Sequence, residues 1–156
     1  MAETTSFQEV YDFFLAGITD DMFMELTKED TEELLQEIML AALPHFEFPR
    51  KDIFDIDVAN ECFNIELTLE EKSIIRAYMI VEWIGYQLAS IENIKQKYSG
   101  SDFKFTSQAQ HIDKLISLRN HYVDEGFRLQ RLYCRRKKSS EKPGYESSFM
   151  RIMEKR

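Results

Sequence analysis

The stretch TLEEKSIIRAYMIVEWIGYQLASI (68–91) decides the fold, because its apolar residues recur at the spacing of one long helix. Thr68 and Glu71 form a capping-box pair that predicts where this helix begins. The turn residues of YSGSDF (98–103) predict that it ends near Tyr98. One face of the helix carries Ile74, Ile75, Tyr78, Val81, Ile84, Leu88 and Ile91.

The sequence predicts a protein without a membrane span, made in a reducing compartment. Arg76, Glu82 and Gln87 interrupt the long apolar stretch, and no run approaches the roughly 18 apolar residues that cross a bilayer. The first ten residues are acidic and polar, unlike a signal peptide. Two cysteines, Cys62 and Cys134, are too few for a disulfide framework.

A second long helix is expected from Ser107, with Gln110 as its capping partner, to about Lys137 or Lys138. The segment SGSDFKFT (99–106) is short enough to fold the two long helices back antiparallel. Each would be roughly 40–45 Å long at 1.5 Å per residue. The face expected to be buried carries Ile112, Leu115, Ile116, Arg119, Tyr122, Val123, Leu129 and Tyr133.

A shorter helix is expected near the N-terminus. Both Thr5–Gln8 and Ser6–Glu9 fit the capping-box pattern at its start. Gly17 is the expected C-terminal stop.

A further helix should run from about Lys28 to Leu43, with Thr27 as its cap and Pro44 at its end. The positive N-terminal end of a helix dipole explains the acidic residues in its first turns. These are Glu29, Asp30, Glu32 and Glu33.

Residues 45–67 have a different pattern, with apolar and polar side chains in alternation at 56–58 and 63–67. Alternation predicts extended chain with one buried face. Two interpretations are open: a small β-hairpin that turns near Asn60, or an extended loop packed on the helices. The fold class is therefore mainly α: an antiparallel bundle with two long helices, this insert and an extended C-terminal arm.

Charge is distributed unevenly along the chain. The formal net charge is -8, but residues 1–71 carry 3 basic and 19 acidic side chains, whereas residues 72–156 carry 17 and 9. Residues 128–156 alone hold 10 basic and 3 acidic side chains. Opposite charges at the two ends of a chain favour head-to-tail contact between copies.

The last residues form a separate segment, so we divide the chain into a helical domain (1–138) and a C-terminal arm (139–156). KKSSEKPGYESS (137–148) has the composition of a flexible linker. The next stretch, SSFMRIMEKR (147–156), has apolar side chains close together in sequence at 149–153. These ten residues are too few to hold a helix without a partner. The arm is therefore expected to dock on another surface.

No catalytic, cofactor or metal site is predicted, and we expect no enzymatic activity. His45, His111 and His121 match no metal-binding spacing, and Cys62 and Cys134 have no close Cys or His in sequence. Cys134 next to two arginines has the surroundings of a reactive thiol, but an ordinary thiol at a helix end is the better interpretation.

The chain resembles neck proteins of tailed bacteriophages, the head–tail connector or head-completion group. The resemblance covers roughly residues 15–135 and rests on two stretches, ITDDMFMELTKEDTEELLQEIMLAALPHFEFPR (18–50) and FNIELTLEEKSIIRAYMIVEWIGYQLASIENIKQKYSGSDFKFTSQAQHIDKLISL (63–118). The other helical connectors are shorter and lack the 45–67 insert, which leaves open the layer of the neck.

This resemblance implies a structural virion protein, made in the host cytoplasm and located between capsid and tail. Such proteins form a ring, commonly of twelve copies, beneath the portal protein. Their C-terminal segments reach the portal, the body carries the next tail or neck protein, and DNA passes through the channel without sequence recognition. Acidic side chains facing the channel would keep DNA from adhering; mapping them on an assembled ring tests this hypothesis.

Partner contacts are expected mainly in the C-terminal segment. The residues expected to bind a partner are Arg135, Arg136, Lys137, Lys138, Tyr145, Phe149, Met150, Ile152 and Met153. Phe103 and Phe105 are candidates for contact between subunits. Two other functions stay open: a helical adaptor or regulator, and a nucleic-acid-binding module whose basic segment contacts phosphates.

Overall fold

The computed structural model describes residues 4–18, 26–97 and 105–136. Within these ranges the fold is mainly helical, as predicted, with two long helices packed together. The helices are α1 (Phe7–Leu15), α3 (Lys28–Ala42), α4 (Leu69–Lys97), α5 (Phe105–Arg135) and the short 3₁₀ helix η1 (Leu43–His45).

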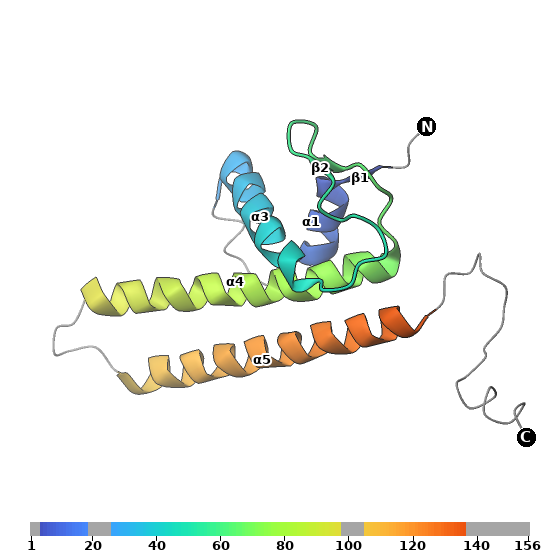
Figure 1. The fold of residues 1–156 in the computed structure, drawn as a ribbon. Coiled ribbons are helices and arrows are strands. Elements are labelled where there is room, and N and C mark those ends of the chain that lie inside the picture. Colours follow the sequence, from blue (N-terminus) through green and yellow to red (C-terminus); the bar gives the residue numbers. More distant parts are fainter. Residues whose placement is uncertain (1–3, 19–25, 98–104, 137–156) are drawn as a thin grey trace, which may run out of the picture.

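Helix α4 lies in the middle of the molecule, with α1 and α3 on one side and the antiparallel α5 on the other (Figure 1). Its first half is therefore surrounded, and its side chains are buried on nearly every face, as expected for a helix that is apolar all round. Its buried apolar residues are Ile74, Ile75, Ala77, Tyr78, Met79, Ile80, Val81, Trp83 and Ile84.

Two of the predicted helix caps are confirmed. Thr68 Oγ1 accepts a hydrogen bond from Glu71 N at 3.3 Å, and Glu71 Oε2 accepts one from Thr68 N at 2.8 Å, which completes the capping box. Thr27 Oγ1 accepts from Asp30 N at 3.2 Å at the start of α3. These local signals place the starts of α3 and α4 correctly.

At the start of α1 the structure decides between the two predicted caps. Ser6 Oγ accepts from Glu9 N at 3.3 Å, so Ser6 is the cap. Thr5 instead lies in a strand, and its buried Oγ1 accepts from Leu67 N at 2.8 Å. The Thr5 hydroxyl thus links β1 to the segment that precedes α4.

Helix α1 ends at Leu15, two residues before the predicted stop Gly17, but Gly17 does not have the left-handed conformation that is typical of such a stop. No glycine in the described ranges has positive φ, and two backbone bonds close α1: Ala16 N–H donates to Asp12 O at 3.0 Å and Gly17 N–H to Phe14 O at 2.9 Å. A Cβ at Gly17 would lie 2.4 Å from Arg76 Nε. This atom belongs to the end of a flexible side chain, so a larger residue at position 17 would require only that Arg76 shift.

The insert contains the β-hairpin, which confirms one of the two predicted alternatives. Strands β2 (Ile56–Asp57) and β3 (Cys62–Phe63) pair antiparallel, and Asp57 Oδ1 accepts from Asn60 N at 3.1 Å in the turn. The two-residue strand β1 (Thr5–Ser6) pairs with the other edge of β3, so the sheet order is β1-β3-β2.

Helix α5 differs from its prediction in two ways. It begins at Phe105 rather than Ser107 and ends at Arg135. Ile116, placed in the buried stripe, is 44% exposed, whereas its neighbour Leu115 is buried. Among the described elements α5 packs mainly against α4, so its buried stripe is narrow, and the side chain one residue further along points about 100° away.

Candidate interaction surfaces

Gln130 holds the C-terminal half of α5 to two other parts of the chain. Its side chain is only 5% exposed. Nε2 donates to Tyr78 Oη on α4 at 2.6 Å and to the backbone oxygen of His45 at 3.0 Å. Oε1 accepts from Glu47 N at 2.9 Å. One amide therefore joins α5, α4 and the start of the insert.

Tyr133 makes a second link, one turn further along α5. Its buried hydroxyl donates to Glu71 Oε1 at 2.5 Å and accepts from Arg50 N at 3.1 Å. The Arg50 guanidinium lies 4.1 Å from the centre of the Tyr133 ring and donates to the backbone oxygens of Tyr133 and Arg136. Burial, together with the bond to Glu71, raises the pKa of Tyr133 to about 12.

A third link lies on the outside of this junction. His45 stacks on the Tyr78 ring, with centroids 5.1 Å apart, and His45 Nε2 lies 2.8 Å from Glu82 Oε1. Burial raises the pKa of Tyr78 above its usual value. We call the contacts of Arg50, Glu71, Tyr78, Gln130 and Tyr133 the anchor network, because they fix where α5 ends.

Beyond the anchor network, the outer side of α5 carries a row of cations: Arg128, Arg131 and Arg135, here called the basic row. All three side chains are exposed. Arg128 pairs with Glu125 at 2.5 Å, which lowers the pKa of that carboxyl group. Arg131 and Arg135 have no ion-pair partner within the described ranges.

The outer side of α3 carries the opposite charge: Glu29, Glu33 and Glu37, here called the acidic row. All three are exposed and have no ion-pair partner among the residues that the structure describes. They lie four residues apart, on the side of α3 away from Leu35 and Met39, which are buried. The helix dipole explains only the first of them, since its effect fades after one turn.

The predicted partner-binding residues are only partly within the described ranges. Arg135 is exposed and unpaired there, whereas the Arg136 guanidinium pairs with Glu70 of α4 and is less available to a partner. Phe105 starts α5, and nothing further is described of its side chain. The remaining predicted contacts lie outside the described residues: Phe103, Lys137, Lys138, Tyr145, Phe149, Met150, Ile152 and Met153.

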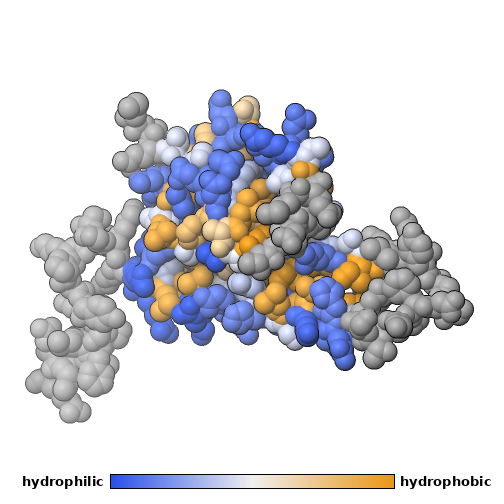
Figure 2. Space-filling view, turned by 180° about the vertical axis from the view of Figure 1, so that it is seen from behind, coloured by the Kyte–Doolittle hydropathy of each residue, from blue (hydrophilic) through white to orange (hydrophobic). Residues whose placement is uncertain are grey.

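The surface also exposes apolar groups, and Figure 2 shows them mostly in the middle and toward the free end of the α4–α5 pair. Leu118 and Ile116 on α5 are exposed, as is Tyr86 on α4.

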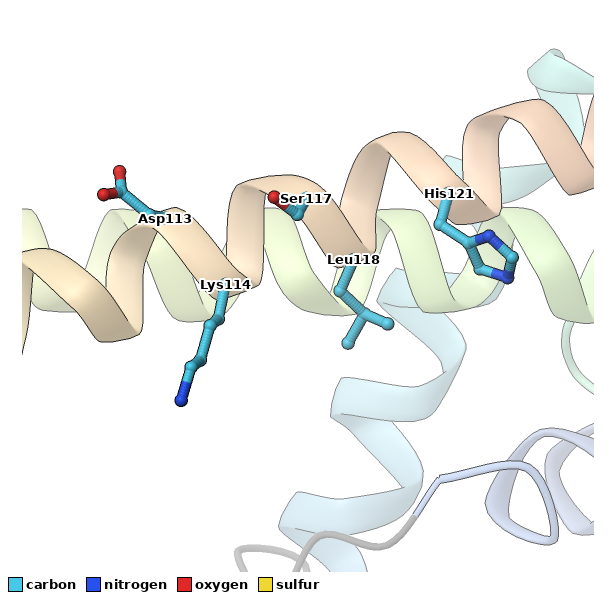
Figure 3. A pocket seen from close by; sticks show the side chains of 5 residues that line it. All are labelled: Asp113, Lys114, Ser117, Leu118 and His121. Atoms are coloured by element: carbon cyan, nitrogen blue, oxygen red, sulfur yellow. The ribbon is translucent and has the colours of Figure 1, made fainter.

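A shallow hollow lies on the outer side of α5, lined by Asp113, Lys114, Ser117, Leu118 and His121. All five come from one helix, and their side chains do not converge, since Asp113 and Lys114 point to opposite sides (Figure 3). Such a hollow has no second wall to enclose a small molecule.

Two kinds of site are absent from the described part of the chain. There, no three His, Cys, Asp or Glu side chains are grouped to hold a metal ion. Nor does any helix in those ranges combine the length and apolar character that crossing a bilayer requires.

Comparisons with protein-family models, with curated proteins and with solved structures gave no match to this chain.

Sequence reasoning missed the anchor network and the acidic row. The acidic row could have been predicted from Glu33 and Glu37. They lie one turn apart, beyond the first turn of the helix, so the helix dipole does not explain them. The role of Gln130 could not have been predicted, because a glutamine among arginines in a helix is expected to be exposed.

Proposed function

We propose that this chain is a non-enzymatic structural component of the neck of a tailed bacteriophage. In this proposal, copies form a ring between portal and tail, and the C-terminal arm (139–156) attaches each copy to the portal protein. DNA passes through the ring without sequence recognition. The next tail or neck protein binds the helical body.

The observation that carries the proposal is the anchored end of α5. The anchor network fixes the last turn of that helix to α4 and to the insert, with Tyr133 bonded to Glu71 and Arg50. The chain therefore leaves the body at a defined point, beside the exposed cation Arg135. A fixed exit point suits a rigid subunit that presents an arm in one direction.

The basic row supports one other function, binding of nucleic acid. Arg131 and Arg135 are exposed without an ion-pair partner in the described ranges, as phosphate contacts require. The acidic row and the net charge of -8 oppose this function, because they repel a polyanion.

Deleting residues 139–156 tests the proposal. We expect the truncated chain to keep its helical circular dichroism and its thermal unfolding, since the anchor network is intact, but to lose attachment to the portal protein in a pull-down. As a control, Ser139→Ala with Ser140→Ala should attach normally. Normal attachment and assembly by the truncated chain would refute the proposal.

A further inference from the structure

We propose that the outer face of the C-terminal half of α5 binds the outer face of α3 in a second copy of this chain. The basic row of one copy would meet the acidic row of the next. This inference names the surfaces through which the subunits of the proposed ring join. That the series of contacts closes into a ring rests on the proposed function.

The first argument is that both rows repel themselves. Arg131 and Arg135 lie four residues apart on α5, as do Glu33 and Glu37 on α3. Like charges at this spacing on a helix repel each other and destabilise it. Within the described ranges neither pair has a counter-ion, so an oppositely charged partner would relieve both.

The second argument is that one copy cannot pair its own rows. Helices α3 and α5 pack on opposite sides of α4 (Figure 1). The acidic row lies opposite the buried face of α3, and the basic row lies opposite the side of α5 that carries Gln130 and Tyr133. The two rows therefore lie on separate parts of the surface, where each is available to a different neighbour.

The third argument is that the rows match in length. Glu29 to Glu37 covers about 12 Å of helix, and Arg128 to Arg135 about 10 Å, at 1.5 Å per residue. Apolar groups flank the basic row, since Phe127 and Leu132 are exposed beside it. Aromatic and aliphatic groups next to paired charges are typical of protein interfaces.

The geometry of such a contact is head to tail. Two different surfaces of the same chain meet, so each copy keeps one free acidic row and one free basic row until the series closes. A chain of this kind forms a ring when the rotation per copy closes, and a filament when it does not.

Charge reversal on the full chain tests the inference, with the mass in solution as readout. Wild type should assemble at low salt and dissociate as salt is raised. Arg131→Glu with Arg135→Glu, and separately Glu33→Lys with Glu37→Lys, should raise the concentration needed for assembly tenfold or more. Mixing the two variants should restore assembly, because each then supplies the row that the other lacks.

Two controls distinguish the effect of charge at the two rows from the effects of side-chain shape and of net charge. Arg131→Lys with Arg135→Lys keeps the charge and should assemble almost as wild type does. Glu47→Lys with Glu66→Lys, at exposed sites outside both rows, changes the net charge as much as Glu33→Lys with Glu37→Lys does and should also assemble. Circular dichroism of every variant checks that it is folded.

Several outcomes would overturn the inference: wild type that stays a single chain, reversal variants with wild-type assembly, or a mixture that fails to recover. Loss of DNA retention by Arg131→Glu with Arg135→Glu, without change in mass, would assign the basic row to nucleic acid instead. The portal pull-down is independent. If charge reversal acts as expected but no portal complex forms, only the proposed neck function falls.

Discussion

The two halves of α5 are held in different ways. The C-terminal half is joined to α4 and the insert by buried polar side chains, with Gln130 and Tyr133 each bonded to residues more than 50 positions away. Within the described ranges the N-terminal half packs against α4 through apolar side chains such as Leu115 and leaves Ile116 and Leu118 exposed. Buried polar side chains therefore add to apolar packing in the C-terminal half of α5.

This difference also concerns function. Contacts that must be presented to a partner at a defined angle benefit from a rigid support. The basic row lies over the anchored half, with Arg131 between Gln130 and Tyr133 in sequence. Changes to the anchor network should therefore affect stability strongly, while the same changes in the other half of α5 should not.

The largest effect is expected from Gln130→Leu. It removes three hydrogen bonds and leaves Tyr78 Oη and Glu47 N without those partners, which should lower the free energy of unfolding by about 2–4 kcal/mol. Urea denaturation measures the change. Gln110→Leu, at an exposed position in the other half of the same helix, should change it by less than about 0.5 kcal/mol. Equal effects of the two substitutions would contradict the comparison.

Tyr133→Phe should have the next largest effect. It removes the hydrogen bond to the buried carboxyl group of Glu71, at about 1.5–3 kcal/mol. Tyr86→Phe, at a half-exposed tyrosine on α4, should be nearly neutral.

The same residue predicts a pH effect. The folded chain binds its Tyr133 proton up to about pH 12, whereas an unfolded chain releases it near the usual value of 10. The contribution is complete below pH 10 and is lost as the pH rises from 10 to 12. Tyr133→Phe should therefore flatten the fall in stability over that window. Part of the fall should remain, because burial also raises the pKa of Tyr11 and Tyr78. An unchanged slope would show that the Tyr133 proton does not contribute.

The smallest effects are expected from two glycines in the long helices. A Cβ at Gly126, in the anchored half, would lie 2.7 Å from the Tyr78 ring, whereas a Cβ at Gly85 would meet nothing closer than Arg119 Nε at 4.0 Å. Gly126→Ala should cost about 1 kcal/mol net, since overpacking exceeds the gain in helix propensity. Gly85→Ala should stabilise by about 0.5–1 kcal/mol. Thermal unfolding of both variants measures this, and stabilisation by both would mean that Tyr78 moves freely.

The fold could be predicted where local chemistry decided it. Thr27 and Thr68 carry capping pairs within three residues, so the starts of their helices were visible in the sequence. The two-residue strand β1 was not, because its pairing with Phe63 depends on residues far apart in the chain. Ile116 was misplaced because helical spacing shows which residues share a face, but not how wide a stripe the neighbour covers.

The candidate surfaces were predicted unevenly. Arg135 was predicted as a contact and is exposed, whereas Arg136 was predicted equally and pairs with Glu70. Neighbouring residues on a helix point about 100° apart, so one can face its own fold while the other faces solvent. Composition alone cannot show which of the two arginines faces solvent. The role of the C-terminal arm (139–156) stays a prediction.

The central claim is that copies of this chain join to form a ring. Electron microscopy of the purified full-length chain at low salt tests it most directly. We predict closed rings that disappear for Arg131→Glu with Arg135→Glu and return when that variant is mixed with Glu33→Lys and Glu37→Lys. Fields of single chains for wild type, at concentrations where the chain is folded and soluble, would contradict the claim.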